Sequence, residues 1–108
     1  MRLLLRNNTE IEIMDCDLPE VYTWDEAVNL CSVIGNNWRL PTVSEIKEIY
    51  NRNVEYKFAE GGYWGYWTCE ETSKEGAILL SGPDGRILND NKKSKFFVRI
   101  VKSQQNDE

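Results

Sequence analysis

The sequence predicts a single α+β domain in which two helices pack on antiparallel strands and hairpins. Residues 23–26 and 42–45 have the Thr-x-x-Glu pattern of a capping box, and apolar residues recur at helical spacing after each. Alternating apolar and polar residues precede the first helix and follow the second, so strands flank the helices. We expect one domain over residues 1–102 and a flexible C-terminal tail over residues 103–108.

The composition excludes several classes of function. With 41% hydrophobic and 29% charged residues, the chain of 108 residues suits one core. Its net charge of -5 gives no general affinity for nucleic acid or anionic membranes, so we expect direct contact with neither. Because the sequence has no histidine, a Ser-His-Asp triad and a histidine zinc site are excluded.

The N-terminus and the cysteines indicate a compartment. The first residues carry no export signal, and no segment approaches the roughly 20 apolar residues that span a bilayer. We therefore expect a cytoplasmic protein, or an extracellular one if a leader has been removed. Cys16, Cys31 and Cys69 leave one cysteine over if two of them pair, and none has Cys-x-x-Cys spacing, so we expect reduced thiols.

A hairpin and the first helix are expected in the N-terminal third. Apolar and polar residues alternate on either side of residues 7–9, which predicts two strands and a turn. Thr23 begins the helix, and Gly35 is placed to end it. The strand residues that alternate are Leu3, Leu5, Ile11 and Ile13, and the core face of the helix is expected to carry Trp24, Ala27, Val28, Cys31 and Ile34.

Residues 38–42 predict a rigid corner before the second helix, which is expected to run from residue 43 to about residue 50. The Thr42 hydroxyl can accept a hydrogen bond from the Glu45 amide while the Glu45 carboxylate reaches back, so two amides of the helix end are satisfied. For Arg39 we favour a structural role over anion binding. The helix is expected to bury Ile46, Ile49 and Tyr50 and to expose Glu45, Lys47, Glu48 and Asn51.

The second half of the chain predicts strands. Residues 61–69 are too rich in glycine and aromatics for a helix, so we expect a loop that leads into a strand. Residues 82–85 read Gly-Pro-Asp-Gly and predict a hairpin turn between strands at residues 77–80 and 86–88. Residues 96–101 are expected to form the last strand, with Arg99 in a structural role.

Several motifs occur in the order that a known family shows. They are Thr23-Trp24-Asp25-Glu26-Ala27, Cys31, Trp38-Arg39-Leu40-Pro41-Thr42, Glu45-Ile46, Tyr66-Trp67-Thr68 and Phe97-Val98-Arg99-Ile100-Val101. In these motifs the chain resembles the Lcl C-terminal type of bacterial domain, found in collagen-like adhesins. The resemblance implies a C-type-lectin-like fold, distantly similar to formylglycine-generating sulfatase-modifying domains. The Glu-Pro-Asn, Gln-Pro-Asp and Trp-Asn-Asp triplets of calcium-dependent lectins are absent, so we expect no metal and no cofactor.

An aromatic run is the leading candidate for a binding surface. In a strand, Tyr63 and Trp67 face one way and Trp64 and Tyr66 face the other. The resemblance puts Trp67 inside, so Trp64 and Tyr66 are expected outside, where flat rings can stack on a sugar or anchor a protein. Burial of all four is the alternative. The candidate partner-binding residues are Tyr63, Trp64, Tyr66, Asp84 and Arg86, and the structural motif comprises Trp38, Arg39, Leu40, Pro41, Thr42, Glu45 and Trp67.

Two polar clusters are expected to be solvated, because neither matches a known ligand-binding spacing. The carboxyl and amide oxygens near the hairpin match no calcium loop, and the lysines lack interleaved aromatics. The first cluster is Asp84, Asn89, Asp90 and Asn91, and the second is Lys92, Lys93 and Lys95.

Three functions remain open. The favoured one is non-catalytic recognition of a protein or glycan, without calcium, through loops between residues 53 and 95. The second is a small acidic phage or mobile-element inhibitor that blocks nucleic-acid-processing machinery by protein contact. The third is an oxidoreductase of the formylglycine-generating type, for which Cys69 lacks an evident cation or base in the sequence around it. Glu70 and Glu71 point to opposite sides of a strand and make a poor acid-base pair. The oligomeric state is left open.

Overall fold

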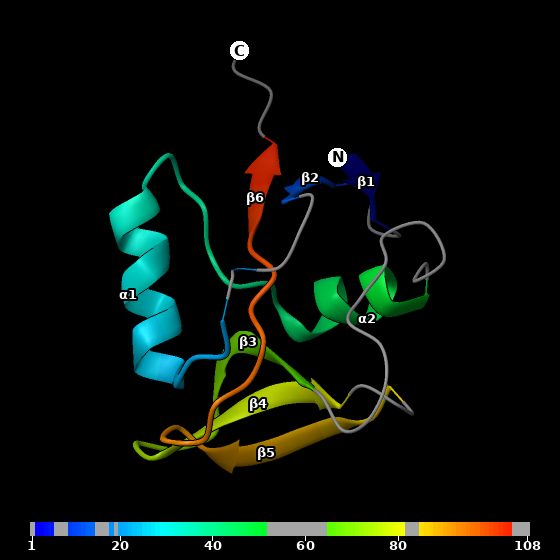
Figure 1. Ribbon diagram of the computed structural model, residues 1–108. Coiled ribbons are helices and arrows are strands. Elements are labelled where there is room, and N and C mark those ends of the chain that lie inside the picture. The colour runs from blue at the N-terminus through cyan, green and yellow to red at the C-terminus, as the bar shows by residue number, and fades with distance from the viewer. Residues whose placement is uncertain are drawn as a thin grey trace.

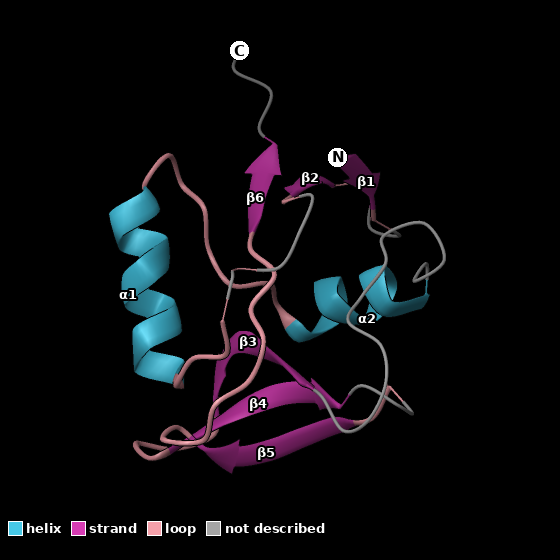
Figure 2. Cartoon of the chain, in the orientation of Figure 1, coloured by secondary structure: helices cyan, strands magenta, loops and turns pink. Residues whose placement is uncertain are grey.

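The computed structural model describes residues 2–5, 9–14, 18, 20–51, 65–81 and 85–104, and it confirms the α+β class (Figures 1 and 2). Two helices lie above a sheet at the bottom of the view, and β1, β2 and β6 lie near the top. The elements are β1 (Arg2–Leu4), β2 (Glu10–Ile13), α1 (Trp24–Ile34), α2 (Val43–Asn51), β3 (Gly65–Glu71), β4 (Gly76–Ser81), β5 (Ile87–Asn91) and β6 (Val101–Gln104). Neither described helix is long and apolar enough to cross a membrane.

The strands form two antiparallel sheets with the orders β1-β2-β6 and β3-β4-β5. The predicted pairing of the two N-terminal strands is confirmed, and the Leu5 amide donates to the Thr9 carbonyl at 2.8 Å. Residues 6–8, where the turn was predicted, lie outside the described residues. In the second hairpin β4 pairs with β5, and Gly85 has the left-handed φ of 70° that the turn pattern required. The rest of that turn, residues 82–84, lies outside the described residues.

The predicted final strand begins later than expected. Residues 96–100 are extended but form only isolated bridges, whereas β6 starts at Val101 and continues through Gln104, two residues into the predicted tail. This segment passes from one sheet to the other and takes a different partner at each step. Phe97 exchanges backbone hydrogen bonds with Gly65 and Trp67 of β3, and Val101 pairs with Arg39 at 2.8 and 2.9 Å. The segment therefore joins the two sheets.

Helix α1 begins and ends as predicted, but its buried face is narrower. Thr23 and Glu26 form the capping box, and the Gly35 amide donates to the Cys31 carbonyl at 3.0 Å. The expected core positions Val28 and Ile34 are 41% and 38% exposed. Only one stripe of α1 packs against the rest of the protein, because the helix lies on one side of β3 and of residues 96–100 (Figure 1). The buried stripe consists of Trp24, Ala27 and Cys31.

The core has two parts, one on each side of β3, and this corrects the prediction for Tyr66. Tyr66 packs with α2 and the β1-β2-β6 sheet, and Trp67 packs with α1 and residues 96–100. Both side chains are 0% exposed. Strand alternation correctly placed the two rings on opposite faces, but both faces are covered, so Tyr66 cannot contact a partner in the folded protein.

Candidate functional site

The predicted binding residues do not form a site within the described residues. Tyr63, Trp64 and Asp84 lie outside them, Tyr66 is in the core, and Arg86 is exposed just before β5. The aromatic and loop surface that the sequence suggested therefore stays a prediction.

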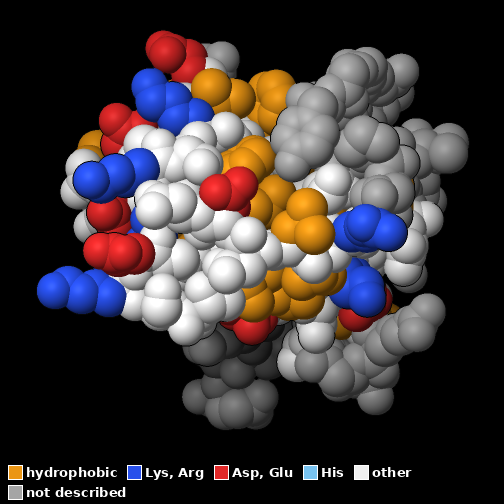
Figure 3. Space-filling view, turned by 90° about the horizontal axis from the view of Figure 1, so that it is seen from below, with side chains coloured by type: hydrophobic (Ala, Val, Ile, Leu, Met, Phe, Trp, Pro, Cys, Tyr) orange, Lys and Arg blue, Asp and Glu red, His pale blue; other side chains and the backbone are white. Residues whose placement is uncertain are grey.

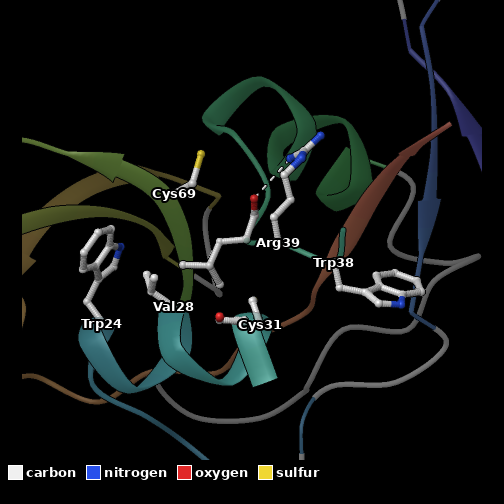
Figure 4. A pocket seen from close by; sticks show the side chains of 8 residues that line it. Trp24, Val28, Cys31, Trp38, Arg39 and Cys69 are labelled. Carbon is white, nitrogen blue, oxygen red and sulfur yellow. Dashed lines mark hydrogen bonds between the residues drawn. The ribbon is translucent and has the colours of Figure 1, made fainter. Parts of the chain in front are cut away.

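A different site is present beside α1. A cavity of about 350 Å³ opens between α1, the corner at residues 38–42 and β3 (Figure 4), and we call it the α1–β3 cavity. Helix α1 contributes Trp24, Val28, Cys31 and Ser32. The corner contributes Trp38, Arg39 and Leu40, and β3 contributes Cys69. The walls are mainly apolar, and a volume near the low end of the usual range for ligand pockets, about 300–1,000 Å³, suits a small group.

The Trp24 wall of the cavity is held by polar contacts on the indole. Its Nε1 donates a hydrogen bond to the Thr68 carbonyl of β3 at 2.9 Å. The ammonium of Lys92 lies 4.5 Å from the ring centre and also donates to the Glu71 carboxylate and the Lys74 carbonyl. Lys92 was expected in a solvated loop, but its side chain is only 11% exposed because it packs between the Trp24 ring and the β3–β4 turn.

The corner side of the cavity is fixed by backbone pairing. Arg39 pairs with Val101, and the Cys69 amide donates to the Pro41 carbonyl at 2.9 Å. The chain reaches the corner through Asn36 and Asn37, whose φ angles of 56° and 68° are left-handed. Asparagine tolerates that conformation better than most residues. The corner side of the cavity is thus held by hydrogen bonds within the protein.

Arg39 lines the cavity with its stem and turns its charge away from it. Its two terminal nitrogens donate to the two carboxylate oxygens of Glu45 at 2.7 and 2.8 Å, and one of them also donates to the Ser103 hydroxyl. The other also donates to the Leu40 carbonyl, the dashed line in Figure 4. Glu45 was predicted to face outward, but its side chain is only 9% exposed. The reason is that its carboxylate both accepts from the Thr42 amide, which caps α2, and pairs with Arg39. These contacts agree with the structural role predicted for Arg39.

The Glu45 carboxyl should make stability depend on pH. Burial raises its pKa, but the hydrogen bonds from Arg39 and from the Thr42 amide outweigh burial, and the pKa falls below its ordinary value of 4.5. A lowered folded-state pKa means that the contribution is complete above the unfolded pKa and is lost as pH falls through the folded one. We expect Glu45→Gln to lower the melting temperature at about pH 7 and to lower it much less at about pH 2.5.

The measurement is thermal unfolding of both proteins at the two pH values. Glu26, whose pKa is also lowered, is present in both proteins and cancels in the difference. A difference in melting temperature that is equal at both pH values would show that the charge of Glu45 does not contribute.

The two thiols of the cavity are free and poorly suited to nucleophilic chemistry. Burial raises the pKa of the Cys31 thiol to about 11. Cys69 is exposed as a residue, but the surrounding walls partly desolvate its thiol and raise the pKa, although the nearby charge of Arg39 partly opposes this. Both thiols are therefore protonated at neutral pH, opposite to what a catalytic thiolate needs. Cys16 lies outside the described residues.

The remaining polar groups serve the fold or form a mixed surface. Glu70 accepts from the Val43 amide at the start of α2 at 2.9 Å, whereas Glu71 pairs with Lys92, so the two carboxylates act on different elements. Among the described residues no group of three or more His, Cys, Asp or Glu could hold a metal ion. A second cavity of about 350 Å³ mixes both charge signs and is lined by Asp25, Lys74, Glu75, Asn91, Lys92 and Lys93.

Comparison with known proteins identifies a family. The family model described as the Lcl C-terminal domain matches residues 5–102. A search of curated proteins finds no match.

Proposed function

The chain belongs to the Lcl C-terminal domain family, and from this premise we propose that it is a non-catalytic recognition module with a C-type-lectin-like fold. It binds a protein partner by taking an apolar side chain into the α1–β3 cavity. The observation that carries the proposal is a fixed, open, mainly apolar cavity with an exposed apolar rim on α1, since Val28 beside it is 41% exposed. The hot-spot residues of protein interfaces are side chains that become buried in such pockets of the partner.

A protein side chain suits this cavity better than a sugar. Sugar sites combine ring stacking with several free hydrogen-bonding groups, because each hydroxyl removed from water needs a partner. The strongest donor of the cavity, the guanidinium of Arg39, already donates to Glu45, Leu40 and Ser103. An apolar anchor loses no hydrogen bonds on entering, so the protein partner is favoured over the glycan.

The other two hypotheses receive less support. The face of the molecule seen in Figure 3 mixes acidic and basic side chains around apolar ones, whereas an electrostatic mimic needs a field of one sign. A redox enzyme would need a thiolate, and burial raises the pKa of both cavity thiols.

Two matched substitutions on α1 test the docking site. Val28→Lys places a charge at the cavity rim, and Val33→Lys makes the same chemical change at a position that is 73% exposed and does not line the cavity. We expect Val28→Lys to weaken partner binding at least about 30-fold, as for a hot spot worth about 2 kcal/mol, and Val33→Lys to leave it unchanged. Both variants should keep the wild-type melting temperature, since both positions are exposed.

The measurement is the affinity of the three proteins for a partner isolated from the host by binding to the wild type. Equal affinities of the wild type and Val28→Lys would remove the cavity from consideration. Equal loss in both variants would mean that the added charge, and not its place, is responsible.

A further inference from the structure

We propose that the group taken by the α1–β3 cavity is an uncharged aromatic side chain of the partner. This inference rests on the proposed function and names the chemistry of the anchor. Three properties of the cavity support it: its electrical neutrality, its size and the kind of atoms in its walls.

The cavity offers no net charge to an incoming group. Its one cationic side chain, Arg39, is paired through both terminal nitrogens with the Glu45 carboxylate of α2. The Arg39 guanidinium points toward α2 (Figure 4). A charged anchor would lose its hydration and gain no unpaired opposite charge. Lysine, arginine, carboxylate and phosphate groups are therefore disfavoured, and an uncharged group is favoured.

The size of the cavity admits a ring. A volume of about 350 Å³ exceeds the roughly 150 Å³ in which an apolar protein cavity holds benzene. An aromatic side chain also loses little conformational freedom on burial, because only two of its bonds rotate. A ring can thus fill the space at a low entropic cost.

The walls carry the partners that rings prefer. The indole of Trp24 on α1 lines the cavity together with Cys31 and Cys69. The ring of Trp38 points away from these side chains, and the Lys102 ammonium lies 4.8 Å from its centre (Figure 4). Edge-to-face ring pairs contribute about 0.5–1.5 kcal/mol beyond area burial, and sulfur near a ring edge is also favourable. An aliphatic side chain would gain only the burial. The wall atoms therefore select an aromatic anchor over an aliphatic one.

The test uses three small probes that differ in one side chain: the N-acetyl amides of phenylalanine, leucine and arginine. Each is titrated into the wild type, Val28→Lys and Val33→Lys, and the indole N–H signal of Trp24 is followed by NMR. We expect saturable shifts with the phenylalanine probe in the wild type and Val33→Lys, and none in Val28→Lys. The leucine probe should bind about 3- to 10-fold more weakly, and the arginine probe should give no saturable shift.

Two outcomes would overturn the inference: leucine or arginine probes that bind as tightly as the phenylalanine probe, or a phenylalanine probe that binds Val28→Lys as well as the wild type. The result is separable from the proposed function. If Val28→Lys no longer binds the isolated partner but the phenylalanine probe shows no preference over the other two, the cavity is still the docking site and the aromatic anchor is wrong. If Val28→Lys keeps the partner, the proposed function fails whatever the probes do.

Discussion

Replacing Arg39 with methionine is expected to lower the free energy of unfolding by about 2–3 kcal/mol, and the melting temperature by roughly 10–20 °C. The substitution leaves the Glu45 carboxylate, 9% exposed, without its cation. It also removes the donors to Leu40 and Ser103, which hold the corner near β6. The expected loss is below the 3–5 kcal/mol of a fully buried pair because the Arg39 side chain is 33% exposed.

The control for Arg39→Met is the double variant Arg39→Met with Glu45→Met, measured by urea unfolding. Because the double variant leaves no buried charge, it should recover part of the free energy of unfolding that Arg39→Met loses. A double-mutant cycle then separates the energy of the ion pair from the energy of lost packing. A single Arg39→Met variant as stable as the wild type would show that the pair does not hold the corner.

Truncation of either ring at the centre of β3 should have the largest effect on stability. Tyr66→Ala and Trp67→Ala are each expected to cost about 3–5 kcal/mol, because both side chains are 0% exposed and fill opposite parts of the core. Trp67 also makes an edge-to-face contact with Phe96, with ring centres 4.9 Å apart, and its Nε1 donates to the Tyr22 carbonyl. Each variant is expected to unfold at a much lower urea concentration.

Cys69→Ala, two residues further along the same strand, is the matched control. Because the Cys69 side chain is exposed, the free energy of unfolding of this variant should stay within about 0.5 kcal/mol of the wild-type value. A Tyr66→Ala protein that is as stable as this control would place Tyr66 at the surface, as the sequence had suggested.

Features set by neighbouring residues could be predicted from the sequence. Both helix starts followed from Thr-x-x-Glu patterns, since the capping hydrogen bonds join residues three apart. The left-handed Gly85 followed from the turn pattern in the same way.

Features set by distant residues could not be predicted. Alternation placed Tyr66 and Trp67 on opposite faces of β3 but carried no information on whether both faces are covered. The burial of Glu45 depends on Arg39, across the corner, and the α1–β3 cavity depends on Trp24 and Cys69, which are far apart in the chain. Val28, which lines the cavity, has the helical spacing of a core residue, so its exposure could not be predicted from the pattern of apolar residues.

The rate at which iodoacetamide alkylates Cys69, with and without the isolated partner, tests the docking site most directly. Cys69 is exposed and lines the α1–β3 cavity, whereas Cys31 lines it from a buried position and should react slowly with and without the partner. Peptide mass mapping reports the two residues separately. An occupied cavity predicts that the partner slows alkylation of Cys69 strongly. An unchanged rate at a saturating concentration of partner would contradict the account.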